Sequence, residues 1–136
     1  MPAKGTIYDL FRRCAENLFF AGGKELILRP ASLAPNSMII YNVTVKIDTA
    51  FHDEWLQWMK ETHIPDVMRS GCFTENRMLK VLTDETDGST YSIQYSCHSM
   101  NDFLEYEHRH APKLRAEHSE KYRDKFVAFR TLLEVV

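Results

Sequence analysis

An α+β domain with the element order βαββαβ is the fold that the sequence predicts for residues 38–136. Three observations predict it. Apolar and polar residues alternate strictly after Met38, two segments with helical spacing each contain a histidine–x–proline motif, and a turn-rich sequence joins two strand-like segments. Short connections and right-handed crossovers give this order a four-stranded antiparallel sheet with both helices on one face.

The first strand is predicted from Met38 onward because its apolar residues recur with a period of two. The polar side chains between them include Asn42 and Thr44, which we expect to point away from the core. The apolar side chains that we expect to face the core are Ile39, Tyr41, Val43, Val45 and Ile47. This strand therefore has one core face and one mostly polar face.

A helix is expected after this strand. Asp48 or Thr49 can cap it, and acidic residues follow in its first turn, where the helix dipole favours them. Pro65 interrupts the helical pattern, residues 66–70 continue it briefly, and Gly71 stops it. The apolar stripe that would pack on the sheet consists of Phe51, Trp55, Trp58 and Met59.

Two further strands, over Phe73–Thr83 and Thr90–His98, are predicted to form an antiparallel hairpin around the sequence DETDG. Ser99 then has the position of a helix cap, Pro112 interrupts the second helix, and a last strand is expected over Lys125–Val136. The inward side chains of this helical region are Met100, Phe103, Leu104, Leu114 and Tyr122. The order obtained is that of a ferredoxin-like domain.

Residues 1–37 differ in character from the rest of the chain. Apolar residues at helical spacing run from Ile7 to Leu18, a Gly-Gly pair ends that pattern, and two prolines follow without a clear element. Two interpretations stay open: an amphipathic helix on a tether, or a segment outside the natural protein, which would then start at Met38. We expect residues 1–37 to be an extension that the domain of residues 38–136 does not need.

The composition restricts the classes of partner. A chain of 136 residues with 44% hydrophobic residues suits one core, and a net charge of −2 without a basic run argues against nucleic acid as a partner. Cys14, Cys72 and Cys97 have neither metal-site nor disulfide-framework spacing, which is typical of a protein kept reduced in the cytoplasm. We find no segment with the pattern of a membrane span or a secretory signal.

The six histidines raise the question of a metal site. His63 and His110 occupy matched positions, but the two helices would run antiparallel, and a helix of about 12 residues spans about 18 Å. One ion therefore cannot reach both, and we expect no metal and no cofactor. We expect instead that each histidine packs beside its proline and hydrogen-bonds the carbonyls that the proline frees.

One face of the predicted sheet has no helix to cover it. Asn42 and Gln94 would lie on this face together with apolar residues of the last strand. A half-polar, half-apolar face suits a face-to-face homodimer around a cavity for a small molecule, and a hydrated face is the alternative. If Arg130 lies on this face beside Asn42 and Gln94, it is the best placed cation for an anionic ligand.

Five stretches of the chain resemble a known family. They are MIIYNVTV from Met38, Glu54-Trp55 with HIPDVM from His63, YSIQY from Tyr91, HAP from His110 and FVAFRT from Phe126. On these residues the chain from Met38 to Val136 resembles the bacterial domain-of-unknown-function family DUF4286. The resemblance implies the fold of the dimeric α+β barrels and carries over no activity.

Some relatives at the level of that fold are monooxygenases, including haem-degrading ones with an Asn on the first strand, a Trp near the third strand and a His on the second helix. By this resemblance Asn42 and either His108 or His110 would take the first and last roles, whereas the third strand offers Tyr91 and Tyr95 but no Trp. We therefore favour a homodimeric, non-catalytic or small-ligand-binding module. Its candidate ligand-binding residues are Asn42, Gln94, His110 and Arg130. The alternative is a monooxygenase-like enzyme that acts on haem or a small aromatic compound.

Overall fold

The computed structural model describes residues 20–21, 24–25 and 37–136 of the chain. Two short strands, β1 (Phe20–Ala21) and β2 (Lys24–Glu25), pair antiparallel with each other. The helical pattern predicted over residues 7–18 lies outside the described residues. The other described residues belong to one compact unit, Ala34–Val136. No helix in these described ranges is long and apolar enough to cross a membrane.

The helices and strands of this unit follow the predicted order. They are β3 (Ile39–Asp48), the 3₁₀ turn η1 (Thr49–Phe51), α2 (His52–Trp58), the π-helical turn η2 (Met59–His63), α3 (Ile64–Arg69), β4 (Glu75–Lys80), β5 (Gly88–Cys97), α4 (Met100–Arg109), α5 (Ala111–Lys121) and β6 (Phe126–Glu134).

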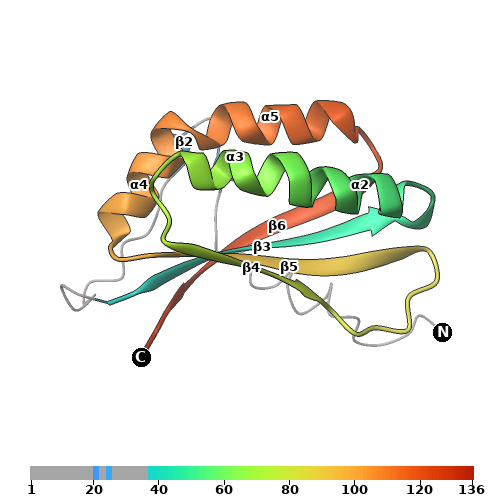
Figure 1. The fold of residues 1–136 in the computed structure, drawn as a ribbon, viewed down its shortest axis with the longest axis horizontal. Coiled ribbons are helices and arrows are strands. Elements are labelled where there is room, and N and C mark those ends of the chain that lie inside the picture. Colours follow the sequence, from blue (N-terminus) through green and yellow to red (C-terminus); the bar gives the residue numbers. More distant parts are fainter. Residues whose placement is uncertain (1–19, 22–23, 26–36) are drawn as a thin grey trace. The chain divides into compact units, whose positions relative to one another are not determined.

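The four long strands form one antiparallel sheet in the order β4-β5-β3-β6. Figure 1 shows that α2, α3, α4 and α5 all lie on the same side of this sheet. The predicted fold class, a ferredoxin-like α+β domain with helices on one face of a four-stranded antiparallel sheet, is confirmed.

The hydrophobic core lies between the sheet and the helices. Ile39, Tyr41, Val45 and Ile47 of β3 are at most 3% exposed, as the alternation predicts. Of the predicted stripe of the first helix, Trp55 is fully buried and Met59 is 3% exposed, whereas Phe51 and Trp58 are half-buried. Removing side chains of this size from water is what holds the helices onto one face of the sheet.

The first helical region is interrupted before Pro65 by a π turn and then continues as α3, as predicted. The Ile64 N–H donates to the carbonyl of Met59, five residues earlier, which is the wider hydrogen bonding of a π turn. Pro65 then lies in the first turn of α3, where its missing N–H is not required. The helix ends at Gly71, as predicted, with a positive φ of 74° that suits glycine.

The second helical region is interrupted, as predicted. The Asp102 N–H donates to Ser99 Oγ over 3.2 Å, which confirms Ser99 as the cap of α4. The helix breaks at His110, and Pro112 occupies the first turn of α5. In the preceding hairpin, β4 is shorter than the predicted strand over residues 73–83.

The face of the sheet away from the helices carries a polar network at its centre. Ser92 Oγ donates to Asn42 Oδ1 over 2.6 Å, and Asn42 Nδ2 donates to Thr44 Oγ1 over 3.2 Å. Gln94, directly opposite Asn42, donates to Ser92 Oγ over 3.4 Å. The apolar side chains that β6 adds to this face are Val127, Phe129 and Leu133.

Candidate functional site

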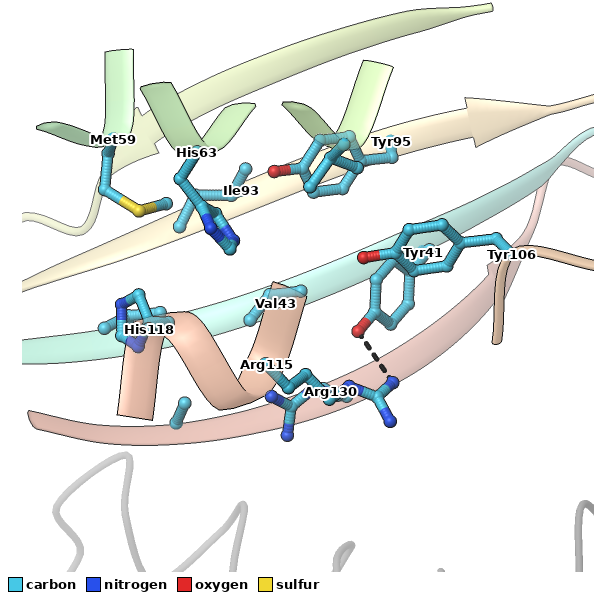
Figure 2. A pocket seen from close by; sticks show the side chains of 13 residues that line it. Tyr41, Val43, Met59, His63, Ile93, Tyr95, Tyr106, Arg115, His118 and Arg130 are labelled. Carbon is cyan, nitrogen blue, oxygen red and sulfur yellow. Dashed lines mark hydrogen bonds between the residues drawn. The ribbon is translucent and has the colours of Figure 1, made fainter. Parts of the chain in front are cut away.

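A cavity of about 40 Å³ lies between the helices and the helix-covered face of the sheet. Residues of β3, β5, β6, η2, α3, α4 and α5 line it. Part of its wall is apolar, and the rest consists of tyrosine, histidine and arginine side chains (Figure 2). The volume is enough for a few waters or a small head group, and it is far below the roughly 300 Å³ at which drug-sized pockets begin.

Two imidazoles form one end of this cavity. Those of His63, from η2, and His118, from α5, have ring centres 5.5 Å apart (Figure 2). Trp58 packs against both rings at 5.0 and 5.6 Å. The Trp55 indole N–H donates to His118 Nε2 over 2.9 Å. The Nδ1 of His63 is buried and has no hydrogen-bond partner among the described residues, so it does not bind the carbonyls freed by proline as predicted.

Burial keeps both imidazoles neutral near pH 7. It lowers the pKa of His63 to about 4, with Asp66 acting in the opposite direction and Arg130 adding to the decrease. The pKa of His118 is lowered to about 3, mainly by burial and to a smaller extent by the nearby His63 and Arg130. Rings with such low pKa values take up a proton poorly at pH 7. They therefore offer the cavity hydrogen-bonding nitrogens without adding charge.

The charge of Arg115, from α5, is compensated inside the protein. Its guanidinium donates to the two carboxylate oxygens of Glu107 over 2.6 and 2.5 Å and to the Tyr41 hydroxyl over 3.1 Å. Burial opposes the charge on Arg115, but the hydrogen bonds with Glu107 and Tyr41 nevertheless raise its pKa. Arg115 lines the cavity, and its bidentate pairing with Glu107 leaves no net charge on the pair.

Arg130, from β6, is the second cation at the cavity. Its cross-strand partner is Val43, which places it on the helix-covered face of the sheet. Within residues 37–136 it has no ion pair, and its buried Nε has no hydrogen-bond partner. Buried polar atoms without partners are rare in proteins and often mark the place of a water or ligand. Arg130 therefore adds one uncompensated positive charge to the cavity.

Three tyrosines lie toward the other end of the cavity (Figure 2). The ring of Tyr41 lies 6.0 Å from that of Tyr95 and 5.7 Å from that of Tyr106. Burial raises the pKa of Tyr95 and Tyr106, so their hydroxyls keep their protons at neutral pH. The aromatic rings can contact the apolar body of a ligand, while protonated hydroxyls can donate hydrogen bonds to it.

The structure separates the four ligand-binding residues that the sequence predicts. Asn42 and Gln94 are cross-strand neighbours on the face away from the helices. Arg130 lies on the opposite face, because it pairs with Val43 and successive strand residues point to opposite sides, so the condition under which it would bind an anion beside them is not met. His110 lies between α4 and α5, outside the cavity wall. Ligand binding by Asn42, Gln94 and His110 stays a prediction.

Sequence reasoning missed His118 and Arg115. His118 lies four residues after Leu114 and four before Tyr122, two positions predicted to face inward, so helical spacing places it on their face. A histidine on the inward face of a predicted helix is the sequence feature that could have indicated His118 as a site residue. Arg115 gave no comparable signal, because its role depends on the buried Glu107 of the preceding helix. The described residues contain no cluster of three or more potential metal ligands.

Solved structures share this fold at low sequence identity. A dimeric ferredoxin-like protein from an uncultured marine organism is 9% identical, with 74% of this chain and 96% of that chain covered and a TM-score of 0.50. A proposed antibiotic biosynthesis monooxygenase from Nitrosomonas europaea is 10% identical, with 77% and 96% covered and a TM-score of 0.54. A proposed oxidoreductase from Bacteroides thetaiotaomicron is 14% identical, with 74% and 99% covered and a TM-score of 0.53.

Likeness at these identities establishes the fold alone. No curated protein matches the chain. The model of a family described as a domain of unknown function, DUF4286, matches residues 38–136, which is most of the chain. On that match, the chain belongs to the DUF4286 family.

Proposed function

We propose that this domain binds a small organic anion in the cavity between the sheet and the helices, with the negative charge of the ligand on Arg130. The observation that carries the proposal is the uncompensated guanidinium of Arg130, whose buried Nε has no partner among the described residues. Holding a cation away from water costs free energy unless an anion or ordered water meets it. A bound anion supplies that partner.

The balance of charge around the cavity favours a ligand with a single negative charge. Arg115 and Glu107 neutralise each other. His63 and His118 are neutral near pH 7 because burial lowers the pKa of each. Of the described residues that line the cavity, Arg130 alone carries a positive charge without an ion-pair partner, so one negative charge on the ligand brings the cavity to neutrality.

The size of the cavity favours a small head group. About 40 Å³ accommodates a group such as a carboxylate, and a longer ligand would extend toward the mouth of the pocket, whose empty space out to solvent is about 460 Å³. The apolar and tyrosine walls suit an aliphatic or aromatic body. A haem does not fit the cavity unless the helices move, because haem is larger than the drug-sized ligands that need several hundred Å³.

We also propose that the module is a homodimer that pairs through the sheet face away from the helices. Val127 and Leu133 on this face are 56% and 42% exposed. The marine structure with the same fold is described as dimeric. A stable interface of roughly 800 Å² per partner would cover such apolar side chains. Replacing Leu133 by Asp should then shift the protein toward monomer in analytical ultracentrifugation, whereas Leu82→Asp, on the exposed loop after β4, should not.

Thermal unfolding with small probe anions tests the binding proposal. Formate, acetate and benzoate should each raise the melting temperature at constant ionic strength, and the neutral amides formamide, acetamide and benzamide should not. A ligand at about ten times its Kd contributes about 1.4 kcal/mol, which is a shift of about 3–6 °C for a domain of this size. The acetate effect should disappear in Arg130→Gln.

Arg123→Gln is the matched control for that variant. Arg123 is an exposed arginine in the turn before β6, so its loss removes the same charge away from the cavity. Its acetate response should equal that of the wild type. An equal loss of response in both variants, or equal stabilisation by acetate and acetamide, would contradict a site at Arg130.

A monooxygenase-like activity on a phenolic compound is the second candidate. It is supported by the fold shared with the proposed monooxygenase from Nitrosomonas europaea and by neutral imidazoles beside Arg130, which could take a proton from a bound phenol. We rank it second because a base with a pKa of about 4 removes such protons poorly at pH 7. Oxygen uptake with hydroquinone would support this activity, and it should not occur if the protein only binds anions.

A further inference from the structure

The hydrogen bond between Trp55 and His118 determines where His118 carries its hydrogen. An indole N–H can only donate, so the His118 Nε2 that it contacts at 2.9 Å must present a lone pair. In a neutral imidazole the hydrogen then lies on Nδ1. Trp55 is fully buried, so its indole N–H is out of contact with bulk water.

The surroundings of His118 hold this arrangement in place. The ring of Phe126 meets the imidazole edge-on at a centre distance of 4.1 Å, and Tyr122 lies 5.9 Å away. A rotation of the imidazole would collide with these rings and leave the buried Trp55 N–H without a partner. Protonation of the imidazole would do the same to Trp55, in agreement with the pKa of about 3 that burial gives His118.

The other nitrogen of His118 is available to a ligand. His118 lines the cavity, and its Nδ1 has no hydrogen-bond partner among the described residues. The charge of Arg130 is close enough to lower the pKa of His118. The cavity therefore combines a cation with a neutral donor whose direction is fixed.

We propose that Trp55 is a positioning residue that holds His118 as the Nδ1–H tautomer. The cavity then selects a carboxylate, which accepts a hydrogen bond from Arg130 on one oxygen and a hydrogen bond from His118 on the other. This inference rests on the proposed anion site and specifies its ligand class. A carboxylate accepts hydrogen bonds on both oxygens, whereas an amide of the same shape must turn an N–H toward one of the two donors. Selection between the two thus follows from the tautomer as well as from the charge.

The tautomer can be measured directly by NMR on the full chain labelled with ¹⁵N-histidine. Long-range proton–nitrogen correlations distinguish the two neutral tautomers, and His118→Gln identifies the signals of His118. The wild type should show the Nδ1–H form alone at pH 7, with or without acetate. A wild-type spectrum with the Nε2–H form, or with both forms, would overturn the inference without any variant.

Trp55→Phe removes the donor and keeps an aromatic ring, and Trp58→Phe is its matched control. Trp58 also contacts the His118 ring, at 5.6 Å, and its indole makes no hydrogen bond to that ring. Trp55→Phe should give a mixture of tautomers, and Trp58→Phe should keep the wild-type form. The preference for acetate over acetamide should be about tenfold or more in the wild type and should fall about threefold in Trp55→Phe only.

The outcomes separate this inference from the proposed function. If the wild type binds acetate but Trp55→Phe keeps both the Nδ1–H tautomer and the full preference for acetate, Trp55 does not position His118. If the wild type binds no acetate at 100 mM while His118 is the Nδ1–H tautomer, the anion site itself fails and carboxylate selection fails with it.

Discussion

The two faces of the sheet hold their polar side chains in different ways. On the face away from the helices, Ser92 of β5 donates to Asn42 of β3 and accepts a hydrogen bond from Gln94. On the helix-covered face, Arg130 and His63 each have a buried nitrogen without a partner among the described residues. The first set is a satisfied network of neighbouring strands, whereas the second retains unused hydrogen-bonding capacity.

This difference shows why a polar sheet face is a weaker sign of a ligand site than a few polar groups in an apolar wall. Cross-strand polar pairs such as Asn42 and Gln94 are an ordinary way to stabilise a sheet. Arg130 is half-buried, and because its Nε is closed off from solvent, a partner for that atom must come from elsewhere. Matched variants on the two faces of the sheet, and at the two cavity cations, test whether these groups differ in their contribution to stability.

The largest expected difference is between Arg115 and Arg130. Arg115→Gln leaves the buried carboxylate of Glu107 unpaired and should lower the free energy of unfolding by about 3–5 kcal/mol. Arg130→Gln removes no ion pair within residues 37–136 and should change the free energy of unfolding by less than about 1 kcal/mol, or raise it. Urea unfolding of both variants measures this. Equal destabilisation would mean that Arg130 serves the fold as Arg115 does.

The next difference concerns adjacent residues of β5 that point to opposite faces. Ile93 lies under the helices and is 1% exposed. Ile93→Ala should lower the free energy of unfolding by about 2–5 kcal/mol, because the cavity that it leaves cannot collapse fully. Gln94→Ala, on the other face, should cost less than about 1 kcal/mol. Urea unfolding at one protein concentration compares them. If Gln94→Ala lowered the free energy of unfolding as much as Ile93→Ala, the polar network on the face away from the helices would be as important for stability as the core.

Acidification should lower the free energy of unfolding by a smaller amount for each cavity histidine. The pKa values of His63 and His118, about 4 and about 3, lie below the value of 6.5 for unfolded histidine. The unfolded chain therefore binds protons first, and stability should fall as the pH decreases below about 6.5. Between pH 6.5 and 5 the loss should be about 1.5 kcal/mol for each histidine.

His118→Gln sharpens that measurement. It should remove about half of the decrease in unfolding free energy between pH 6.5 and 5, whereas His98→Gln, an exposed histidine after β5, should leave the decrease unchanged. A pH profile that is identical in all three proteins would contradict the burial of neutral imidazoles at the cavity.

Most of the fold can be predicted from the sequence because local patterns determine it. The alternation after Met38, the Ser99 cap and the glycine at position 71 each place an element boundary through chemistry within a few residues. Pro65 interrupts the regular α-helix, as predicted, and the chain stays helical across it because the π turn before it and its place in the first turn of α3 remove the need for its N–H.

The candidate site is harder to predict because it depends on register and on distant contacts. A shift of one residue exchanges the two faces of a strand, so the side on which Arg130 lies follows only once its pairing with Val43 is known. The meeting of His63 with His118, and of Arg115 with Glu107, arises from how separate helices pack. Neither contact leaves a motif in the sequence.

The most direct test of an anion site at Arg130 is an NMR titration of the ¹⁵N-labelled protein with acetate that follows the arginine Nε–H signals. The Arg130 signal should shift and saturate, while that of Arg115, held by Glu107, and that of exposed Arg123 should move little. An unchanged Arg130 signal at saturating acetate, or the same unsaturated drift in all three, would contradict the site.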